Sequence, residues 1–375
     1  MENKNIHILV ISDPPAAPGY LPRLRYLCRF LVQKGYCVTV LTEEYQPLDF
    51  EHEYPIQTIR MYSGSTFDWM VKTAWTLLTD WHNAAFARKA INLLQGQKFD
   101  VVLCTVFSDF PLGAGRQIAQ YFHIPLLCDI RDLDEQVDNS SYQYHHKSRW
   151  LMPFRRLYRA IHIRRRNEVL RTANAVTTVS PWHKEFISQF NPNVHVVYNG
   201  YDAAQFYPED IVSDAFKITY IGSFFEWQKA GLEKVQRAIS ELNIPVVLDI
   251  HTPQNKTVNH QDLGKTIQQS SMMLVLTSPN THGMLTTKFY EALGCCKPIL
   301  CVPSDQGSLA ELINYTRAGI ATDNIEKIKA FITEIYNEWK QNGFTRQHPL
   351  HREQFSRETQ CEQLETIILS LIRHD

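Results

Sequence analysis

Short apolar runs alternate with helix-like segments along most of the 375-residue chain. The run Ile6–Ile11 ends at a Ser-Asp-Pro-Pro turn, and a helix pattern over Leu21–Lys34 ends at Gly35 before the run Cys37–Leu41. A run that is apolar at every position and bounded by turn residues is typical of a strand buried on both faces of a parallel sheet. The repeated order of strand, helix and strand therefore predicts an α/β fold with doubly wound parallel sheets.

The alternation forms two series, each of which predicts a Rossmann-like half. Further strands are expected at 101–106, 125–130, 175–179 and 194–198 in the first series, and at 218–221, 246–250, 272–276 and 299–302 in the second. We expect an N-terminal domain over 1–203, a second domain over 204–350, and a C-terminal segment, 351–375, whose helix (359–372) crosses back to the first domain. A cleft beyond the carboxyl ends of the strands is the default ligand site of such halves.

Composition excludes several classes of protein. The 38 Lys and Arg against 39 Asp and Glu give a net charge of −1, which argues against a nucleic-acid partner. No run approaches the ~18–20 apolar residues of a membrane span, and the N-terminal apolar run is too brief for a signal peptide. The eight cysteines include no C-x-x-C pair, so we expect reduced, buried cysteines in a cytoplasmic protein and no zinc site.

The near-neutral charge conceals a strongly basic segment. Residues 145–171 contain nine Lys and Arg against Glu168 alone, so they carry +8 and the remainder carries −9. Their apolar residues recur at helical spacing, at Leu151, Phe154, Leu157 and Ile161. Such a basic amphipathic helix either packs its apolar stripe in the core or lies on anionic lipid or an acidic acceptor.

A second apolar segment, rich in tryptophan, lies in the first half. It contains Trp69, Met70, Trp75, Leu77, Leu78 and Trp81. We interpret it as core, with a lipid-facing surface as the alternative.

Glycines at two predicted strand ends suggest phosphate binding. Gly19 lies in the loop before the first helix, where backbone N–H groups of a Rossmann half meet a phosphate. Gly222 and Ser223 end the first strand of the second half, with Lys229 shortly after. Gly222 would allow close backbone approach to a phosphate and Lys229 would supply positive charge. The alternatives are a surface loop and a solvated lysine.

The segment 282–291 combines a helix start with a carboxylate. Thr286 or Thr287 is suited to the N-cap, and Gly294 to the helix end. Glu291 then lies one turn into the helix, where a carboxylate can accept two hydrogen bonds from a ribose diol while free N–H groups hold phosphate. The alternative is a Glu that interacts only with the helix dipole.

An acidic cluster follows a strand of the first half. It contains Asp129, Arg131, Asp132, Asp134 and Glu135. Carboxylates at this position can orient an acceptor hydroxyl, and arginine can bind an anion. An ion-paired loop is an equally weighted alternative.

Taken together, these segments resemble the retaining glycosyltransferases of family 4, which have the GT-B fold. The resemblance runs through most of the chain. The segment 129–133 is similar to a D-x-R-D-L motif of a subgroup that acts in surface-polysaccharide assembly. The other similar segments are G-Y-C-V-T-V-L-T at 35–42, A-N-A-V-T-T-V-S at 173–180, Y-N-G-Y-D at 198–202 and T-K-F-Y-E-A-L at 287–293.

The resemblance implies transfer of a hexose-type sugar from a UDP- or GDP-sugar to a hydroxyl of a glycan or lipid-linked acceptor, with retention of configuration. It implies no cofactor and no active-site metal. Glu291 matches the family's ribose-binding Glu. Gly222, Ser223 and Lys229 match its diphosphate-binding strand end, and Gly19 matches a loop facing the donor diphosphate. The cysteine content predicts a cytoplasmic protein, and the lipid-binding alternative for 145–171 would place it at the inner face of the membrane.

Two departures from the family pattern affect the predicted site. Gly283 replaces the first Glu of E-x7-E, which leaves backbone N–H groups of the donor-side segment to serve instead: Gly283, Met284, Leu285, Thr286 and Thr287. The family's first-half histidine has no counterpart, so Asp109, Asp129 or Asp132 would orient the acceptor, with Asp132 favoured. Arg131 and Glu135 are expected on the acceptor side. The rival functions are a GT-B sugar-nucleotide epimerase and a non-catalytic scaffold.

Overall fold

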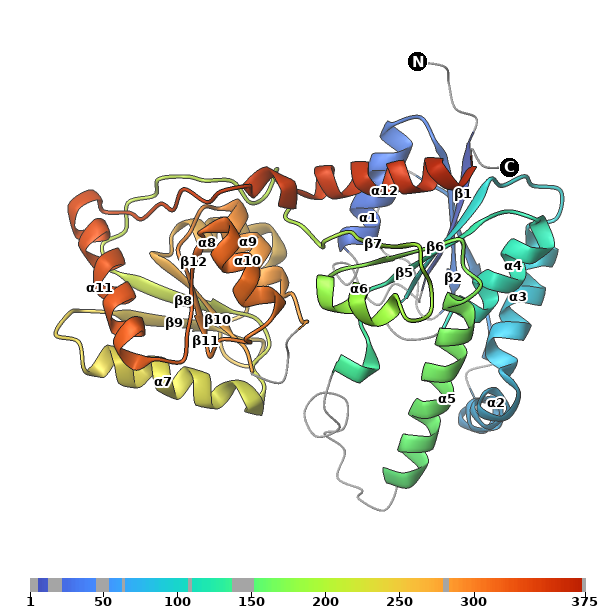
Figure 1. Ribbon diagram of the computed structural model, residues 1–375, viewed down its shortest axis with the longest axis horizontal. Helices are drawn as coiled ribbons and strands as arrows, with labels where there is room; N and C mark the ends of the chain where they lie inside the picture. The colour runs from blue at the N-terminus through green and yellow to red at the C-terminus, as the bar shows by residue number, and fades with distance from the viewer. Residues whose placement is uncertain are drawn as a thin grey trace. The chain divides into compact units, whose positions relative to one another are not determined.

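The computed structural model describes residues 6–12, 22–44, 54–62, 65–106, 110–136, 152–278 and 283–372 (Figure 1). They belong to two compact units, each treated by itself below. The first covers Met1–Glu135, His145–Val197 and Cys361–Asp375, and the second covers Gln136–Tyr144 and Tyr198–Gln360. Each unit contains one sheet whose strand pairs are parallel, which confirms the predicted α/β class. The sequence-predicted bounds, 203/204 and 350/351, stay a prediction.

The first unit is built on a seven-stranded sheet of order β3-β2-β1-β4-β5-β6-β7. Its strands are β1 (His7–Ser12), β2 (Cys37–Glu43), β3 (Ile56–Ile59), β4 (Val101–Val106), β5 (Leu126–Ile130), β6 (Ala175–Thr178) and β7 (Val194–Val196). The helices are α1 (Pro22–Gln33), α2 (Thr66–Thr79), α3 (Trp81–Leu93), α4 (Leu112–Phe122), α5 (Met152–Leu170) and α6 (Pro181–Ile187).

The apolar run of β1 serves two cores. Leu9 and Ile11 join the cluster on one face of the sheet, and Ile8 and Val10 join the cluster on the other. Successive side chains of a strand point to opposite faces, so a strand covered on both faces must be apolar at every position. Gly35, at the end of the first helix, has the left-handed φ of 87° that its position predicted.

The second unit is built on a five-stranded sheet of order β12-β11-β10-β8-β9. Its strands are β8 (Lys217–Ile221), β9 (Val247–His251), β10 (Met272–Leu276), β11 (Ile299–Val302) and β12 (Gly319–Ala321). The helices are α7 (Lys229–Ser240), α8 (Leu263–Gln268), α9 (Thr287–Gly294), α10 (Ser308–Thr316) and α11 (Ile325–Asn342). Met273 and Val275 of β10 enter one core and Leu274 enters the other.

Helix α12 (Arg357–Ile372) begins among residues of the second unit and ends in the first. Its side chains Cys361, Leu364 and Ile368 are buried in the core that also contains Ile8 and Val10. The hydroxyl of Tyr36 donates to Glu365, with 2.5 Å between the two oxygens. α12 therefore completes the first unit from the far end of the chain.

The tryptophan-rich segment is only partly core: Trp81 packs against a core cluster of the first unit, whereas Trp75 and Leu78 are exposed, which corrects the prediction for these two. The side chains of Trp69, Met70 and Leu77 lie outside what the structure describes. In α2 the side chains of Phe67, Trp75 and Leu78 are 76%, 54% and 76% exposed. The helix is apolar on the side that faces solvent. No helix of the described residues, α2 included, meets the length and hydropathy that a membrane span requires.

The described part of the predicted apolar stripe, Leu157 and Ile161, is not the most buried side of α5. Leu157 is 54% exposed, whereas His162, Arg166 and Val169 are buried. Ile161 is half-buried, and both Leu151 and the Phe154 side chain lie outside what the structure describes. The buried side of this helix is therefore partly polar, and a packed arginine replaces the expected apolar contacts.

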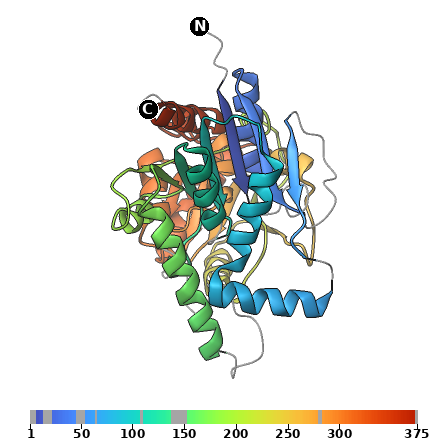
Figure 2. The same cartoon turned by 90° about the vertical axis from the view of Figure 1, so that its right-hand side faces the viewer.

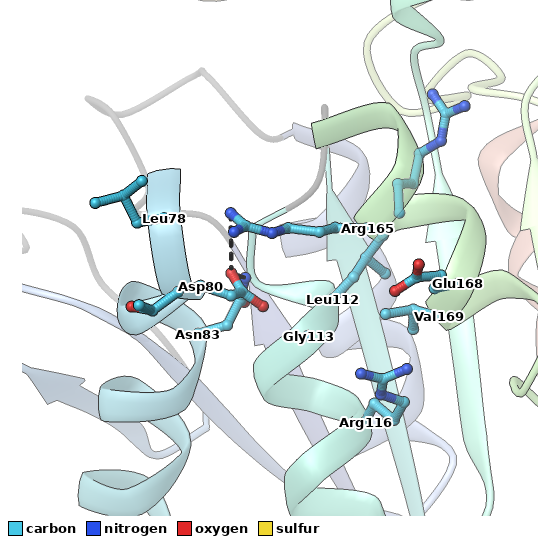
Figure 3. A pocket seen from close by; sticks show the side chains of 11 residues that line it. Leu78, Asp80, Asn83, Leu112, Gly113, Arg116, Arg165, Glu168 and Val169 are labelled. Carbon is cyan, nitrogen blue, oxygen red and sulfur yellow. Dashed lines mark hydrogen bonds and ion pairs between the residues drawn. The ribbon is translucent and has the colours of Figure 1, made fainter. Parts of the chain in front are cut away.

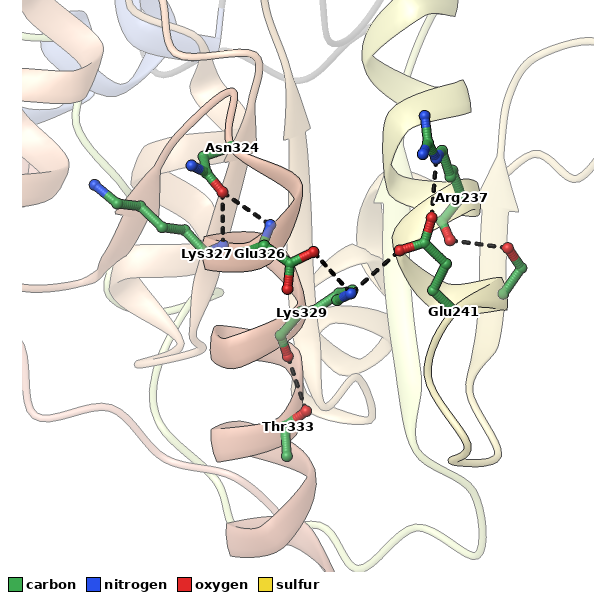
Figure 4. Close-up of polar contacts among 8 residues, drawn as sticks. Arg237, Glu241, Asn324, Glu326, Lys327, Lys329 and Thr333 are labelled. Carbon is green, nitrogen blue, oxygen red and sulfur yellow. Dashed lines mark hydrogen bonds and ion pairs between the residues drawn. The ribbon is translucent and has the colours of Figure 1, made fainter.

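Exposed ion pairs join α7 and α11 on the surface of the second unit (Figure 4). Lys329 lies 3.1 Å from a carboxylate oxygen of Glu241 and 2.8 Å from one of Glu326. Hydrogen bonds from Arg237 and Lys329 lower the pKa of Glu241. Such solvated pairs add little to stability. The eight cysteines form no disulfide, and all except Cys37 are buried, as expected.

Candidate functional site

The carboxyl end of β8 brings a glycine and a lysine together. Gly222 has a φ of 130°, which strongly favours glycine. A Cβ built on Gly222 would lie 2.8 Å from Nζ of Lys288, a residue of α9. The same Nζ lies 5.4 Å from the ring centroid of Tyr220. Glycine at 222 thus leaves the space that the Lys288 ammonium occupies beside the strand end.

Helix α9 places a carboxylate one turn beyond this lysine. Oγ1 of Thr286 caps the helix by accepting a hydrogen bond from the Lys288 N–H at 3.4 Å, which confirms the predicted N-cap. Burial raises the pKa of Glu291, opposed by the charges of Lys288 and Arg357 and by a hydrogen bond from Thr287. The first-turn N–H groups of a helix have no partner within it and carry its positive end. Lys288, which carries the ammonium, and Glu291, which carries the carboxylate, therefore both lie within about one turn of the N-terminus of α9.

Burial lowers the pKa of Lys288, and the neighbouring Glu291 carboxylate opposes that shift. A bound anion would stabilise the charged ammonium in the same way. The pair is therefore suited to a ligand that brings negative charge to the lysine and hydroxyl groups to the carboxylate.

The other predicted donor-side residues contribute less directly. Lys229 is exposed at the first position of α7, so Lys288, and not Lys229, is the cation that the structure places against Gly222. The Gly222 N–H donates to the carbonyl of His251 at 2.9 Å and is not available to a phosphate. The Ser223 side chain is exposed, and its carbonyl accepts from Tyr220.

The segment before α9 can contact a ligand mainly through its backbone groups, because several of its side chains are buried. Gly283 is buried and Leu285 packs in the core, whereas Met284 and Thr286 are half-buried and Thr287 is exposed. Any ligand contact from Leu285 must therefore come from its main chain. Sequence reasoning missed Lys288, although its position three residues before Glu291 on one helix could have indicated that the two are neighbours.

In the first unit, Asp129 has a structural set of partners. Its Oδ2 accepts from Arg23 at 3.1 Å and from Thr105 at 2.9 Å, and its Oδ1 accepts from Thr177 at 2.8 Å. The carboxylate is nearly buried and joins β5 to α1, β4 and β6. A carboxylate with both oxygens already engaged is poorly placed to act as a base.

Asp132 remains the better acceptor-side candidate. Its side chain is exposed, whereas Arg131 beside it is buried. Desolvation by the surrounding chain raises the pKa of Asp132, and the Arg131 charge opposes the rise. Asp109 and Gly19 lie outside the described residues.

Glu135 holds a buried arginine instead of facing outward. Its Oε1 and Oε2 accept from Nη2 and Nη1 of Arg166 at 2.5 and 2.9 Å. Burial lowers the pKa of the nearby His183 to about 4, and the Arg166 charge contributes. No local sequence pattern indicates this cluster, because Glu135, Arg166 and His183 lie on segments that are distant along the chain.

A pocket of about 270 Å³ lies beside this cluster in the first unit (Figure 3). Arg165 reaches across its rim toward the junction of α2 and α3, where it lies 3.7 Å from Asp80 and donates to the Thr76 carbonyl. Arg116 and Glu168 also line it. Within the described residues, no group of three or more His, Cys, Asp or Glu is placed to hold a metal ion.

Solved structures identify the fold. A glycosyltransferase from Rickettsia africae has 12% identity, a TM-score of 0.64, and coverage of 99% of this chain and 100% of its own. HepE from Anabaena, in complex with UDP-glucose, has 12% identity, a TM-score of 0.61 and coverage of 98% and 100%. A putative UDP-N-acetylglucosamine 2-epimerase from Listeria monocytogenes has 12% identity, a TM-score of 0.51 and coverage of 99% and 97%. The chain has the GT-B fold.

The family comparison concerns the first half of the chain. Residues 23–205 match the model of Glycosyltransferase Family 4. No curated protein sequence matches the chain. The family match and the fold agree with the predicted resemblance, while retention of configuration and a role in polysaccharide assembly stay predictions.

Proposed function

We propose that the protein is a glycosyltransferase that moves a hexose-type sugar from a UDP- or GDP-sugar to a hydroxyl of a glycan or lipid-linked acceptor, with retention of configuration. The observation that carries the proposal is the arrangement of Gly222, Lys288 and Glu291 in the second unit. The family match over residues 23–205 and a GT-B neighbour solved with UDP-glucose support it.

In the proposed mechanism, the donor diphosphate lies against Lys288 and the N-terminus of α9. Positive charge fixed at this position stabilises the diphosphate as the bond to the sugar breaks. Glu291 accepts hydrogen bonds from the ribose diol. Asp132 orients the acceptor hydroxyl, which forms the new bond to the anomeric carbon and gives up its proton to the phosphate oxygen that the sugar has left. Because side chains supply the positive charge, we propose that no divalent ion is needed.

The nucleotide site is tested by UDP titration of matched lysine variants. Lys288→Met should weaken UDP binding by roughly 10–150-fold, the range of one charge-assisted hydrogen bond. Lys229→Met serves as the control, because Lys229 is exposed at the start of α7. Equal loss in the two variants, or no loss in Lys288→Met, would refute the assignment.

A second pair of variants tests the ribose contact. Glu291→Ala should weaken UDP binding, whereas Glu311→Ala, an exposed first-turn glutamate of α10 in the same unit, should not. A ribose contact also predicts that Glu291→Ala loses no affinity for inorganic diphosphate. Loss toward both ligands would indicate a general disturbance of α9.

An epimerase is the second candidate, because a putative UDP-N-acetylglucosamine 2-epimerase shares the fold. Incubation of a panel of UDP- and GDP-sugars with and without acceptor separates the two functions. Transfer requires the acceptor and releases the nucleoside diphosphate, whereas epimerisation proceeds without acceptor and leaves the nucleotide-sugar intact. Binding without either reaction would favour the scaffold, and loss of transfer on adding a chelator would refute the metal-free mechanism.

A further inference from the structure

The outward face of α2 is apolar, which is unusual for a helix on the surface of a domain. Its exposed side chains Phe67, Val71, Trp75 and Leu78 follow one another at intervals of four, four and three residues. These intervals place all four on one side of the helix.

The polar side chains of α2 hold the helix to the rest of the first unit. Nζ of Lys72 lies 2.7 Å from Asp68 and donates to the Met61 carbonyl at 2.8 Å. It also lies 5.5 Å from the ring centroid of Trp81. Among the described side chains of α2, the charged Asp68 and Lys72 thus lie toward the protein and the four apolar ones toward solvent.

Helix α5 contacts the C-terminal end of α2 and carries further basic and apolar groups. Its sequence contains six arginines and one glutamate. Arg156 and Arg164 are exposed, the latter with an 82% exposed side chain, and Leu157 and Tyr158 are exposed between them. Arg165 joins the helices by donating to the Thr76 carbonyl at 2.7 Å. Figure 2 shows α2 and α5 extending beyond the sheet at the same end of the first unit.

We propose that α2 and α5 form a membrane-binding surface that takes an anionic lipid bilayer, with the apolar face of α2 in the interface and the α5 arginines on lipid headgroups. An apolar face with a tryptophan, flanked by arginines, is the composition of helices that lie in the plane of a bilayer. The exposed arginines favour anionic lipid over an uncharged apolar partner. The proposal is independent of sugar transfer, because it rests on a different surface.

Vesicle flotation of the full-length protein tests the proposal without any nucleotide-sugar. The protein should float with vesicles of phosphatidylcholine and phosphatidylglycerol, bind weakly to phosphatidylcholine alone, and dissociate as salt is raised. Trp75→Ser and Leu78→Ser should each reduce binding by about tenfold. Leu93→Ser is the control, because Leu93 is an exposed leucine of α3 in the same unit.

The charge contribution is tested separately. Arg156→Gln and Arg164→Gln should each weaken binding to anionic vesicles by about fivefold and reduce its salt dependence. All these side chains are exposed, so unchanged melting temperatures should show that folding is intact. Absence of binding to anionic vesicles at low salt would overturn the proposal, as would α2 variants that bind like the parent protein. A dimer that Leu78→Ser dissociates, without vesicle binding, would assign the face to a second copy.

Discussion

Replacement of Arg166 by methionine should destabilise the first unit far more than the same replacement two residues earlier. The Arg166 side chain is 2% exposed and makes two hydrogen bonds to Glu135 and two to Asn167. Removing one partner of a buried ion pair costs about 3–5 kcal/mol. Because Glu135 retains some contact with solvent, the lower end, about 3 kcal/mol, is expected.

Thermal unfolding measures this difference directly. For a unit of roughly 200 residues, 1 kcal/mol corresponds to about 2–4 °C, so Arg166→Met should lower the melting temperature by roughly 6–12 °C. Arg164→Met is the matched control on α5, because Arg164 is solvent-exposed and makes only an i,i+4 pair with Glu168. Its effect should stay within about 0.5 kcal/mol. Similar shifts for the two variants would refute the view that Arg166 and Glu135 are a buried, coupled pair.

A double variant refines the result. If the cost of Arg166→Met comes mainly from the carboxylate left behind, Arg166→Met with Glu135→Gln should be less destabilised than the sum of the two single variants. Strict additivity would instead assign the cost to lost packing alone.

The remaining predictions concern the nucleotide site and acid stability. Gly222→Ala should displace Lys288 and weaken UDP binding, measured by calorimetry, by at least about tenfold. The control is Gly35→Ala, at a φ of 87° with no atom within 4 Å of a new Cβ, which should lower stability without affecting UDP binding. Equal UDP affinity in the two variants would contradict the proposed site. His183 has a pKa of about 4 in the folded chain and about 6.5 when unfolded. Between these two values the unfolded state binds the extra proton, so the free energy of unfolding decreases as the pH falls. Between pH 7 and pH 5 this amounts to about 2 kcal/mol, so His183→Gln should lose less stability than the parent over that interval in urea unfolding, and an identical loss would exclude His183 as the cause.

The sequence predicts best those strands whose own run of apolar residues shows that both faces are buried. The strand bounds predicted at 101–106 and 272–276 match β4 and β10, because a strand buried on both faces is apolar at every position. Strand β3, with the sequence Ile-Gln-Thr-Ile, was missed because it is short, only partly buried and neither continuously apolar nor alternating.

The candidate site was less predictable, because its geometry depends on distant segments. Lys288 meets Gly222 across 66 positions of the chain, and no local pattern encodes that approach. Asp129 and Asp132 look equivalent after a strand, yet one is enclosed by three donors and the other reaches solvent. The sequence predicts core for Trp75 and Leu78 of α2, which are exposed, because hydrophobicity alone does not say whether an apolar side chain is covered.

The return of α12 to the first unit has a consequence for synthesis. Its buried residues, from Cys361 onward, are made only after the 163 residues that separate Val197 from Cys361. At about 5–20 residues per second, the strands of the first unit wait roughly 8–30 s for their last helix. During that interval the nascent chain exposes the apolar surface that α12 later covers, which is the kind of surface that chaperones bind. A chain whose synthesis stops before Cys361 would therefore have a first unit with one core uncovered.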